Sequence, residues 1–99
     1  MGSRVSSQSV VVAARDQVSC DLAGETAILQ IESGTYYRLD PVGARVWTLL
    51  QQPTRVDRLC HMLLTEYDVA PARLEQDLMN LLGDLLAERL IEVRDEPPR

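Results

Sequence analysis

The sequence contains no phenylalanine and no lysine, and its aromatic side chains are three tyrosines and one tryptophan among 99 residues. Without phenylalanine the interior must be filled by leucine, valine and isoleucine, and 45% of the residues are hydrophobic. A chain of this length forms one domain, which buries about 60–65% of the surface that the unfolded chain exposes. The composition therefore predicts a single small domain with an aliphatic core.

Long apolar runs are also missing. The longest uninterrupted one is Val10–Ala14, far short of the roughly 20 residues that a membrane-spanning helix needs. No apolar segment of the kind found in secretory signals follows the N-terminus. We therefore expect no membrane partner and a cytoplasmic location.

Cysteine and histidine are too few and too widely spaced for a metal centre. Cys20 and Cys60 are distant in sequence, and His61 is the only histidine, whereas structural zinc needs four ligands at close spacing. Adjacent residues on a helix point about 100° apart, so Cys60 and His61 do not form a nucleophile–base pair. The sequence predicts two reduced thiols, no metal, no cofactor and no catalytic residues.

Positive charge is sparse and dispersed. Ten arginines are scattered along a chain whose formal net charge is −5. Proteins that bind nucleic acids normally gather basic residues on one face, because much of the affinity comes from neutralising phosphates. The charge balance argues against nucleic acids and anionic membranes as partners, and it favours a partner of basic or mixed charge.

Alternating and β-branched segments near the N-terminus predict a small antiparallel meander of two or three strands. Gln17–Asp21 and Thr26–Ile31 have this character, and Val10–Val12 has strand propensity without alternation. The loop Glu32–Gly34 then returns the chain into Thr35–Leu39, in which successive side chains face opposite sides.

After the meander the hydrophobic period changes from two residues to 3.6, which predicts helices. Asp40 is expected to cap the first helix, with Pro41 at its first position, and the helix ends before Pro53. Thr54, followed three residues later by Asp57, resembles a capping box and is expected to start the second helix.

The order of elements predicts an α+β fold of the winged-helix kind, with a β-meander followed by three helices. Residues 1–8 are polar and rich in serine, and residues 95–99 include two prolines. We expect the first segment to be disordered and the last to be a flexible tail. Residues 9–94 then form the single domain.

The segment Asp68–Pro71 breaks the second predicted helix and opens a third, which runs to about Arg89 and is followed by a short extended segment at Leu90–Val93. The apolar residues of this third helix span an arc of roughly 160–180°, wider than the ~100° stripe of an ordinary surface helix. The arc consists of Leu74, Leu78, Met79, Leu81, Leu82, Leu85 and Leu86. Either this helix lies at the centre of the core, or part of the arc is a docking surface.

The chain contains several distinctive residues in a fixed order. They are a turn glycine, an aromatic residue and a leucine on a strand, an acidic helix cap, a pair of small residues, a tryptophan, a tyrosine and a leucine-rich helix. In this chain they are Gly34, Tyr37, Leu39, Asp40, Gly43, Ala44, Trp47, Tyr67, Leu78, Leu81, Leu82 and Leu85. This order resembles the PqqD-like proteins, the leader-peptide recognition elements of ribosomal peptide natural-product pathways. The resemblance covers about Val18 to Ile91, and it is greatest for the stand-alone recognition proteins of lasso-peptide pathways.

The resemblance implies a non-catalytic adaptor. In such proteins a disordered precursor leader adds as an antiparallel strand to the edge of the third strand and lays apolar side chains against the third helix. The leader is then presented to a separate leader peptidase and a maturation enzyme. The peptide-binding residues implied by position are Thr35, Tyr36, Tyr37, Arg38, Leu39, Leu74, Asp77, Leu78, Leu81, Leu82 and Leu85. Asp77 is expected to pair with a leader lysine or arginine.

Other interpretations remain open at this level. The residue pattern by itself favours a core role for Tyr37, Leu39 and Trp47 over contact with a ligand. A winged-helix DNA-binding protein and a homodimerisation module are the two alternative functions.

Overall fold

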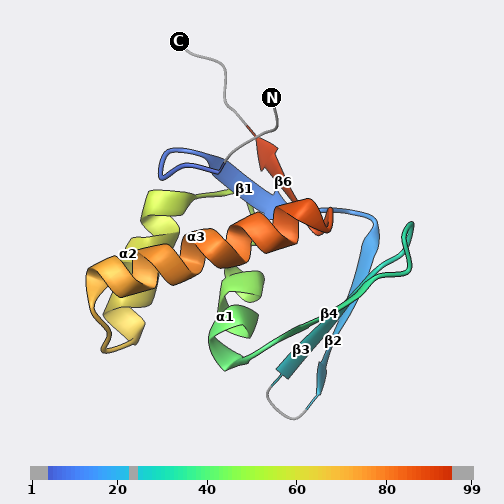
Figure 1. The fold of residues 1–99 in the computed structure, drawn as a ribbon, viewed down its shortest axis with the longest axis horizontal. Coiled ribbons are helices and arrows are strands. Elements are labelled where there is room, and N and C mark those ends of the chain that lie inside the picture. Colours follow the sequence, from blue (N-terminus) through green and yellow to red (C-terminus); the bar gives the residue numbers. More distant parts are fainter. Residues whose placement is uncertain (1–4, 23–24, 95–99) are drawn as a thin grey trace.

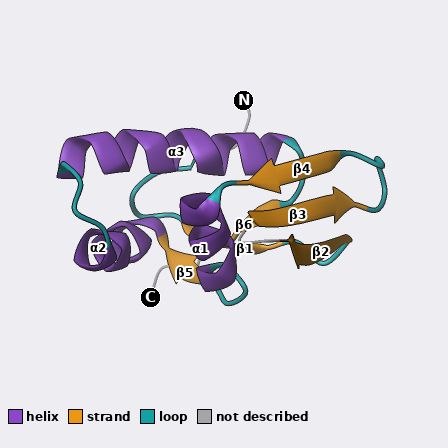
Figure 2. Cartoon of the chain, turned by 90° about the horizontal axis from the view of Figure 1, so that it is seen from below, coloured by secondary structure: helices purple, strands orange, loops and turns teal. Residues whose placement is uncertain are grey.

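The computed structural model describes residues 5–22 and 25–94, which form two small antiparallel sheets and three helices (Figure 1). In chain order the elements are β1 (Val10–Ala13), β2 (Gln17–Leu22), β3 (Glu25–Gln30), β4 (Tyr36–Leu39), α1 (Pro41–Leu49), β5 (Thr54–Arg55), α2 (Val56–Glu66), α3 (Pro71–Ala87) and β6 (Ile91–Arg94). The β2–β3–β4 sheet extends to one side of the helices (Figure 2). The predicted α+β class is confirmed.

The β2–β3–β4 sheet is the meander expected from the sequence. All three strands are antiparallel to their neighbours, and each lies within one residue of its predicted bounds. Thr35 precedes β4, but its carbonyl oxygen accepts a hydrogen bond from the backbone N–H of Gln30 at 2.9 Å. Gly34 has a φ of 74°, a conformation that glycine adopts without steric cost and that the hairpin loop requires.

The second sheet, with strand order β5–β1–β6, was not expected. The sequence indicated strand propensity at Val10–Val12 and an extended segment at Leu90–Val93, but nothing in it paired the two. In the structure Val11 lies opposite Val93, and both Val11 and Val12 are buried. Successive side chains of a strand face opposite sides, so β1 is covered on both faces, which explains why it shows no alternation.

The start of α1 agrees with the prediction. The Asp40 carboxylate accepts a hydrogen bond from the backbone N–H of Gly43 at 2.8 Å, and Pro41 occupies the first turn. Val46 and Trp47 of this helix are buried in the core. The cap therefore fixes the direction in which α1 leaves β4.

The predicted capping box of α2 is wrong. Thr54 belongs to β5, and its hydroxyl donates to the carbonyl oxygens of Leu49 and Gln52 at 3.3 and 2.9 Å. The Asp57 carboxylate instead pairs with the side chain of Arg55 at 2.9 Å. Because Thr54 is committed to the preceding turn and to strand pairing, its hydroxyl does not cap the helix.

Main-chain groups from the N-terminal segment satisfy the first turn of α2. The backbone N–H groups of Val56 and Asp57 donate to the carbonyl oxygens of Ser9 and Ser7 at 2.9 and 2.8 Å. These N–H groups have no partner within the helix itself. A segment remote in sequence thus takes the place of the expected side-chain cap.

The third helix contributes one side of its wide apolar arc to the core. Leu74, Leu78, Leu82 and Leu85 are its buried residues, and α3 packs on α2 and β6. Figure 1 shows α3 crossing the molecule over the other two helices. The core interpretation therefore accounts for these four leucines.

A buried glutamine connects the end of α3 to the β3–β4 hairpin. Arg89 follows α3 with a φ of 60°, and the N–H of Leu90 donates back to the carbonyl oxygen of Leu85 at 2.9 Å. Gln30, only 3% exposed, donates to the carbonyl oxygen of Arg89 at 3.0 Å and accepts from the N–H of Glu32 at 2.7 Å. One side chain thus joins the hairpin loop to the helix terminus.

Residues 1–4 of the segment expected to be disordered, and the whole expected tail at residues 95–99, lie outside the described residues. Within residues 5–22 and 25–94, the helices are too short or too polar to cross a membrane.

Candidate functional site

An apolar cleft of about 560 Å³ opens between β4 and the first half of α3, and residues from α1 and from the end of α2 complete its lining. Its apolar walls include Leu39, Val42, Val46, Leu74, Leu78 and Leu81. Cavities of about 300–1,000 Å³ with mainly apolar walls are typical ligand sites. This cleft is the candidate functional site.

Strand β4 forms one border of the cleft and is an edge strand. Among the described residues it pairs with β3 alone. The hydrogen bond from Gln30 to Thr35 shows that these two residues form a hydrogen-bonded pair of the β3–β4 ladder. Such pairs occur at every second position of an antiparallel ladder. The next hydrogen-bonded pair is therefore Ile28 with Tyr37.

The alternation leaves Tyr36 and Arg38 with their backbone N–H and C=O groups directed toward the open edge. The side chain of Tyr36 is 60% exposed. The guanidinium of Arg38 forms an exposed ion pair with Glu25 at 2.9 Å on the neighbouring strand. The backbone groups at these two positions are available to an additional strand. Thr35, before the strand, does not line the cleft.

Tyr37 and Leu39 face α3 from β4. Leu39 is buried in the core, whereas Tyr37 is half-buried and packs against its edge. Burial raises the pKa of the Tyr37 phenol above 10.0, and the carboxylates of Asp84 and Glu88 raise this pKa further. The phenol is therefore protonated at neutral pH, next to two acidic side chains of α3.

The leucines of α3 fall into two groups. Leu74 and Leu78 are buried but reach the cleft wall, and Leu81 lines the cleft with part of its side chain exposed. Leu82 and Leu85 have no exposed surface and do not line the cleft. The structure thus brings three of the five leucines to the candidate site.

Asp77 lies at the rim of the cleft, as its position on α3 suggested. Its carboxylate pairs with Arg73, one turn earlier, at 3.4 Å, and both side chains are largely exposed. An exposed pair of this kind contributes about 0–1 kcal/mol. Asp77 is therefore accessible to a ligand, in competition with Arg73.

Sequence reasoning missed the contribution of α1 and of the α2–α3 loop. Val42 and Val69 line the cleft and are 38% and 43% exposed, which is unusual for large apolar side chains. Gly43 also lines it, where a Cβ atom would lie 3.2 Å from the side chain of Leu39. Helical periodicity alone assigns Val42 to the core, so only the structure reveals its exposure.

A family model described as coenzyme PQQ synthesis protein D (PqqD) matches residues 25–91, more than half of the chain. The chain belongs to the PqqD family. Among solved structures, it is similar to one described as TbiB1 in complex with the TbiA(beta) leader peptide. The TM-score is 0.76 and the sequence identity 30%, over 86% of this chain and 99% of that chain. No curated protein gives a significant sequence match.

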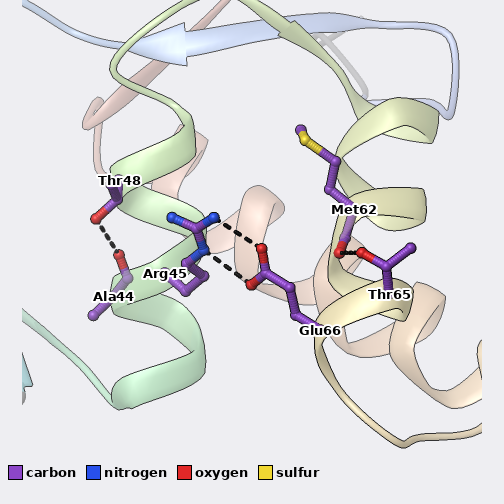
Figure 3. Close-up of polar contacts among 6 residues, drawn as sticks. All are labelled: Ala44, Arg45, Thr48, Met62, Thr65 and Glu66. Carbon is purple, nitrogen blue, oxygen red and sulfur yellow. Dashed lines mark hydrogen bonds and ion pairs between the residues drawn. The ribbon is translucent and has the colours of Figure 1, made fainter.

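In this PqqD-family domain an ion pair joins the two helices that complete the cleft. The Arg45 guanidinium of α1 donates two hydrogen bonds to the Glu66 carboxylate of α2 at 2.9 and 2.8 Å (Figure 3). The hydrogen bond from Arg45 lowers the pKa of Glu66 below 4.5. Tyr67, the next residue, lines the cleft, so the pair links α1 and α2 beside the cleft.

A second, smaller cavity of about 310 Å³ lies between α2 and α3 of the PqqD-family domain. Cys60, His61 and Glu75 are among its lining residues. Burial raises the pKa of the Cys60 thiol, and the Glu75 carboxylate raises this pKa further, which disfavours the nucleophilic thiolate. Within the described part of the chain, no cluster of three or more potential ligand side chains is arranged to hold a metal.

Proposed function

We propose that this PqqD-family chain is a non-catalytic adaptor that binds the leader peptide of a ribosomally made precursor. The observation that carries the proposal is the open edge of β4 directly beside an apolar cleft. A similar structure is described as a complex with a leader peptide, which supports the same class of ligand.

In the proposed mode the leader adds as an antiparallel strand beside β4. The outward N–H and C=O groups of Tyr36 and Arg38 hydrogen-bond to the leader backbone, which gives affinity largely independent of sequence. Alternate leader side chains enter the cleft next to Leu39 and Leu81 and provide selectivity. A disordered leader loses conformational entropy when it binds, which limits the affinity.

The proposed site residues differ in role. The backbone contacts fall to Tyr36 and Arg38, and the rim contact falls to Asp77. The side chains proposed to touch the leader are Tyr37, Leu39, Leu74, Leu78 and Leu81. Thr35 holds the hairpin through Gln30. Leu82 and Leu85 support α3 from within the core, so we propose no direct contact for them.

We further propose that the leader belongs to a lasso-peptide precursor and that the adaptor acts in the cytoplasm. The loaded adaptor presents the precursor to a leader peptidase and a maturation enzyme, which carry out the chemistry. The resemblance to stand-alone recognition proteins supports this division of labour, and the described lining of the cleft contains no serine, threonine, cysteine, histidine or lysine.

The proposal is tested by NMR titration of the isotopically labelled protein with synthetic leader peptides of the precursors encoded beside its gene. We expect backbone amide shifts concentrated in residues 35–39 and 74–81. A well-folded protein that gives no shifts with any of these leaders would contradict the proposal. Resonances of β4 that instead change with protein concentration would indicate homodimerisation through this edge.

A substitution in the cleft tests the site separately. We expect Leu81→Glu to weaken leader binding by more than about ten-fold, because it places a charge in an apolar wall. Leu86→Glu is the matched control, since Leu86 is a partly buried leucine of the same helix that does not line the cleft. Far-UV circular dichroism checks that both variants are folded. Equal weakening by the two substitutions would argue against the cleft as the binding site.

The charges at the cleft disfavour DNA as the ligand. The flank of α3 nearest β4 carries Asp77 at the cleft rim and Asp84 beside Tyr37. Carboxylates at these positions repel phosphates, whereas a DNA-reading helix presents basic or amide side chains to the groove.

A further inference from the structure

The flank of α3 that faces the open edge of β4 carries a stripe of three acidic residues and one leucine. Asp77, Leu81, Asp84 and Glu88 are spaced four, three and four residues apart, so they lie along one side of the helix. Asp77 and Leu81 line the cleft. Asp84 and Glu88 continue the same stripe beyond it, toward the C-terminal end of α3.

Neither of the two distal carboxylates has a cationic partner in the described structure. Asp77 pairs with Arg73, but within the described residues neither Asp84 nor Glu88 makes an ion pair. Asp84 is exposed and Glu88 half-buried. Both lie close enough to Tyr37 to act on its phenol. Negative charge is thus concentrated where a strand added to β4 would present side chains to α3.

The positions of the β4 side chains indicate which residues of an added antiparallel strand would lie next to these carboxylates. In an antiparallel pair, side chains directly opposite each other lie on the same face of the sheet. A leader residue opposite Leu39 therefore faces the cleft, and a residue opposite Tyr37 faces Asp84 and Glu88. Because the strands run in opposite directions, the second residue follows the first by two positions.

We propose that the ligand bound between β4 and α3 is a basic leader segment. An apolar residue of this segment fills the cleft, and a lysine or arginine two positions later faces Asp84 and Glu88. This inference rests on the proposed leader-binding function and specifies the chemistry of the segment recognised. Charge complementarity selects this occupant, since an acidic or neutral strand would bring no positive charge to the two carboxylates beside the bound backbone.

The test measures binding of the fluorescein-labelled leader peptide encoded beside the gene, by fluorescence anisotropy at 50 and 300 mM salt. We compare the wild type with the double variant Asp84→Asn/Glu88→Gln. The matched control is Glu75→Gln, which removes a carboxylate from the opposite flank of α3, at the second cavity. Far-UV circular dichroism checks the fold of each variant.

We expect the double variant to bind the leader about two- to ten-fold more weakly at low salt and to lose most of the salt dependence, as for partly exposed ion pairs. The Glu75→Gln control should bind like the wild type. A leader in which the lysine or arginine of the apolar-x-basic pattern is replaced by glutamine should weaken binding to the wild type, with little further effect on the double variant.

The outcomes separate the two proposals. If the wild type binds the leader and the double variant binds with the same affinity and salt dependence, the basic-segment inference is overturned while the proposed function stands. If the wild type binds no leader, the proposed function and the inference fall together.

Discussion

Leu81 and Leu82 are adjacent in sequence but have different environments on α3. Leu82 is completely buried, whereas Leu81 keeps part of its surface exposed in the cleft. The spacing of apolar residues shows that the apolar arc of this helix is wider than an ordinary buried stripe. It does not show which side of the arc is buried in the core and which stays exposed. That choice depends on where β6 and α2 pack against the helix.

Glu66 of α2 pairs with Arg45 of α1, so its charge state affects the stability of the helices beside the cleft. Its folded-state pKa is lowered by the hydrogen bond from Arg45, so the pair stabilises the fold above the unfolded-state pKa. This contribution is lost as the pH falls through the lower folded-state pKa. We expect Glu66→Gln to lower the melting temperature at pH 7 and to have a much smaller effect at pH 3.

The measurement is thermal unfolding followed by circular dichroism at several pH values for the wild type and Glu66→Gln. Glu75→Gln serves as control, because in the described structure Glu75 takes part in no ion pair. A difference between the wild type and Glu66→Gln that does not change between pH 7 and pH 3 would mean that the ion pair is not its source.

Among the secondary-structure elements, β4 matters most for binding, because its register with β3 determines which of its backbone groups are directed outward. The sequence predicted the strand and the alternation of its side chains, but not which backbone groups face outward. That assignment follows from the Gln30–Thr35 hydrogen bond in the hairpin. A shift of one residue in the pairing register would reverse it.

We expect Arg38→Pro to weaken leader binding strongly, because proline removes an N–H that is directed toward the added strand. Arg38→Ala separates this effect from loss of the guanidinium and its ion pair with Glu25, and it should bind nearly as the wild type does. Binding is measured by isothermal titration with the leader peptide. If the proline and alanine variants bind equally well, backbone addition at β4 is not the mode of binding.

At the scale of the whole molecule, Gln30 links the β2–β3–β4 sheet to the end of α3. Its side chain satisfies the Arg89 carbonyl and the Glu32 N–H at once, and an exposed ion pair between Glu32 and Arg89 at 3.5 Å lies beside it. Because β4 and α3 border the cleft, this link also sets the position of one wall relative to the other.

We expect Gln30→Ala to lower the free energy of unfolding by about 2 kcal/mol, because it leaves a backbone donor and a backbone acceptor without their partner. Urea denaturation measures the change. Gln76→Ala, at an exposed position of α3, is the control and should change stability by less than about 0.5 kcal/mol. A similar loss in both variants would indicate that helix and side-chain propensities, and not the link, determine the stability.

Local patterns in the sequence are enough to predict the α+β class, the meander, the cap of α1 and the resemblance to the PqqD family, because these depend on periodicity and on the spacing of a few residues. The second sheet, the capping of α2 by Ser7 and Ser9, and the exposure of Val42 and Val69 in the cleft are visible only in the folded chain. Each of these depends on contacts between segments distant in sequence, and such contacts leave no mark in the local pattern.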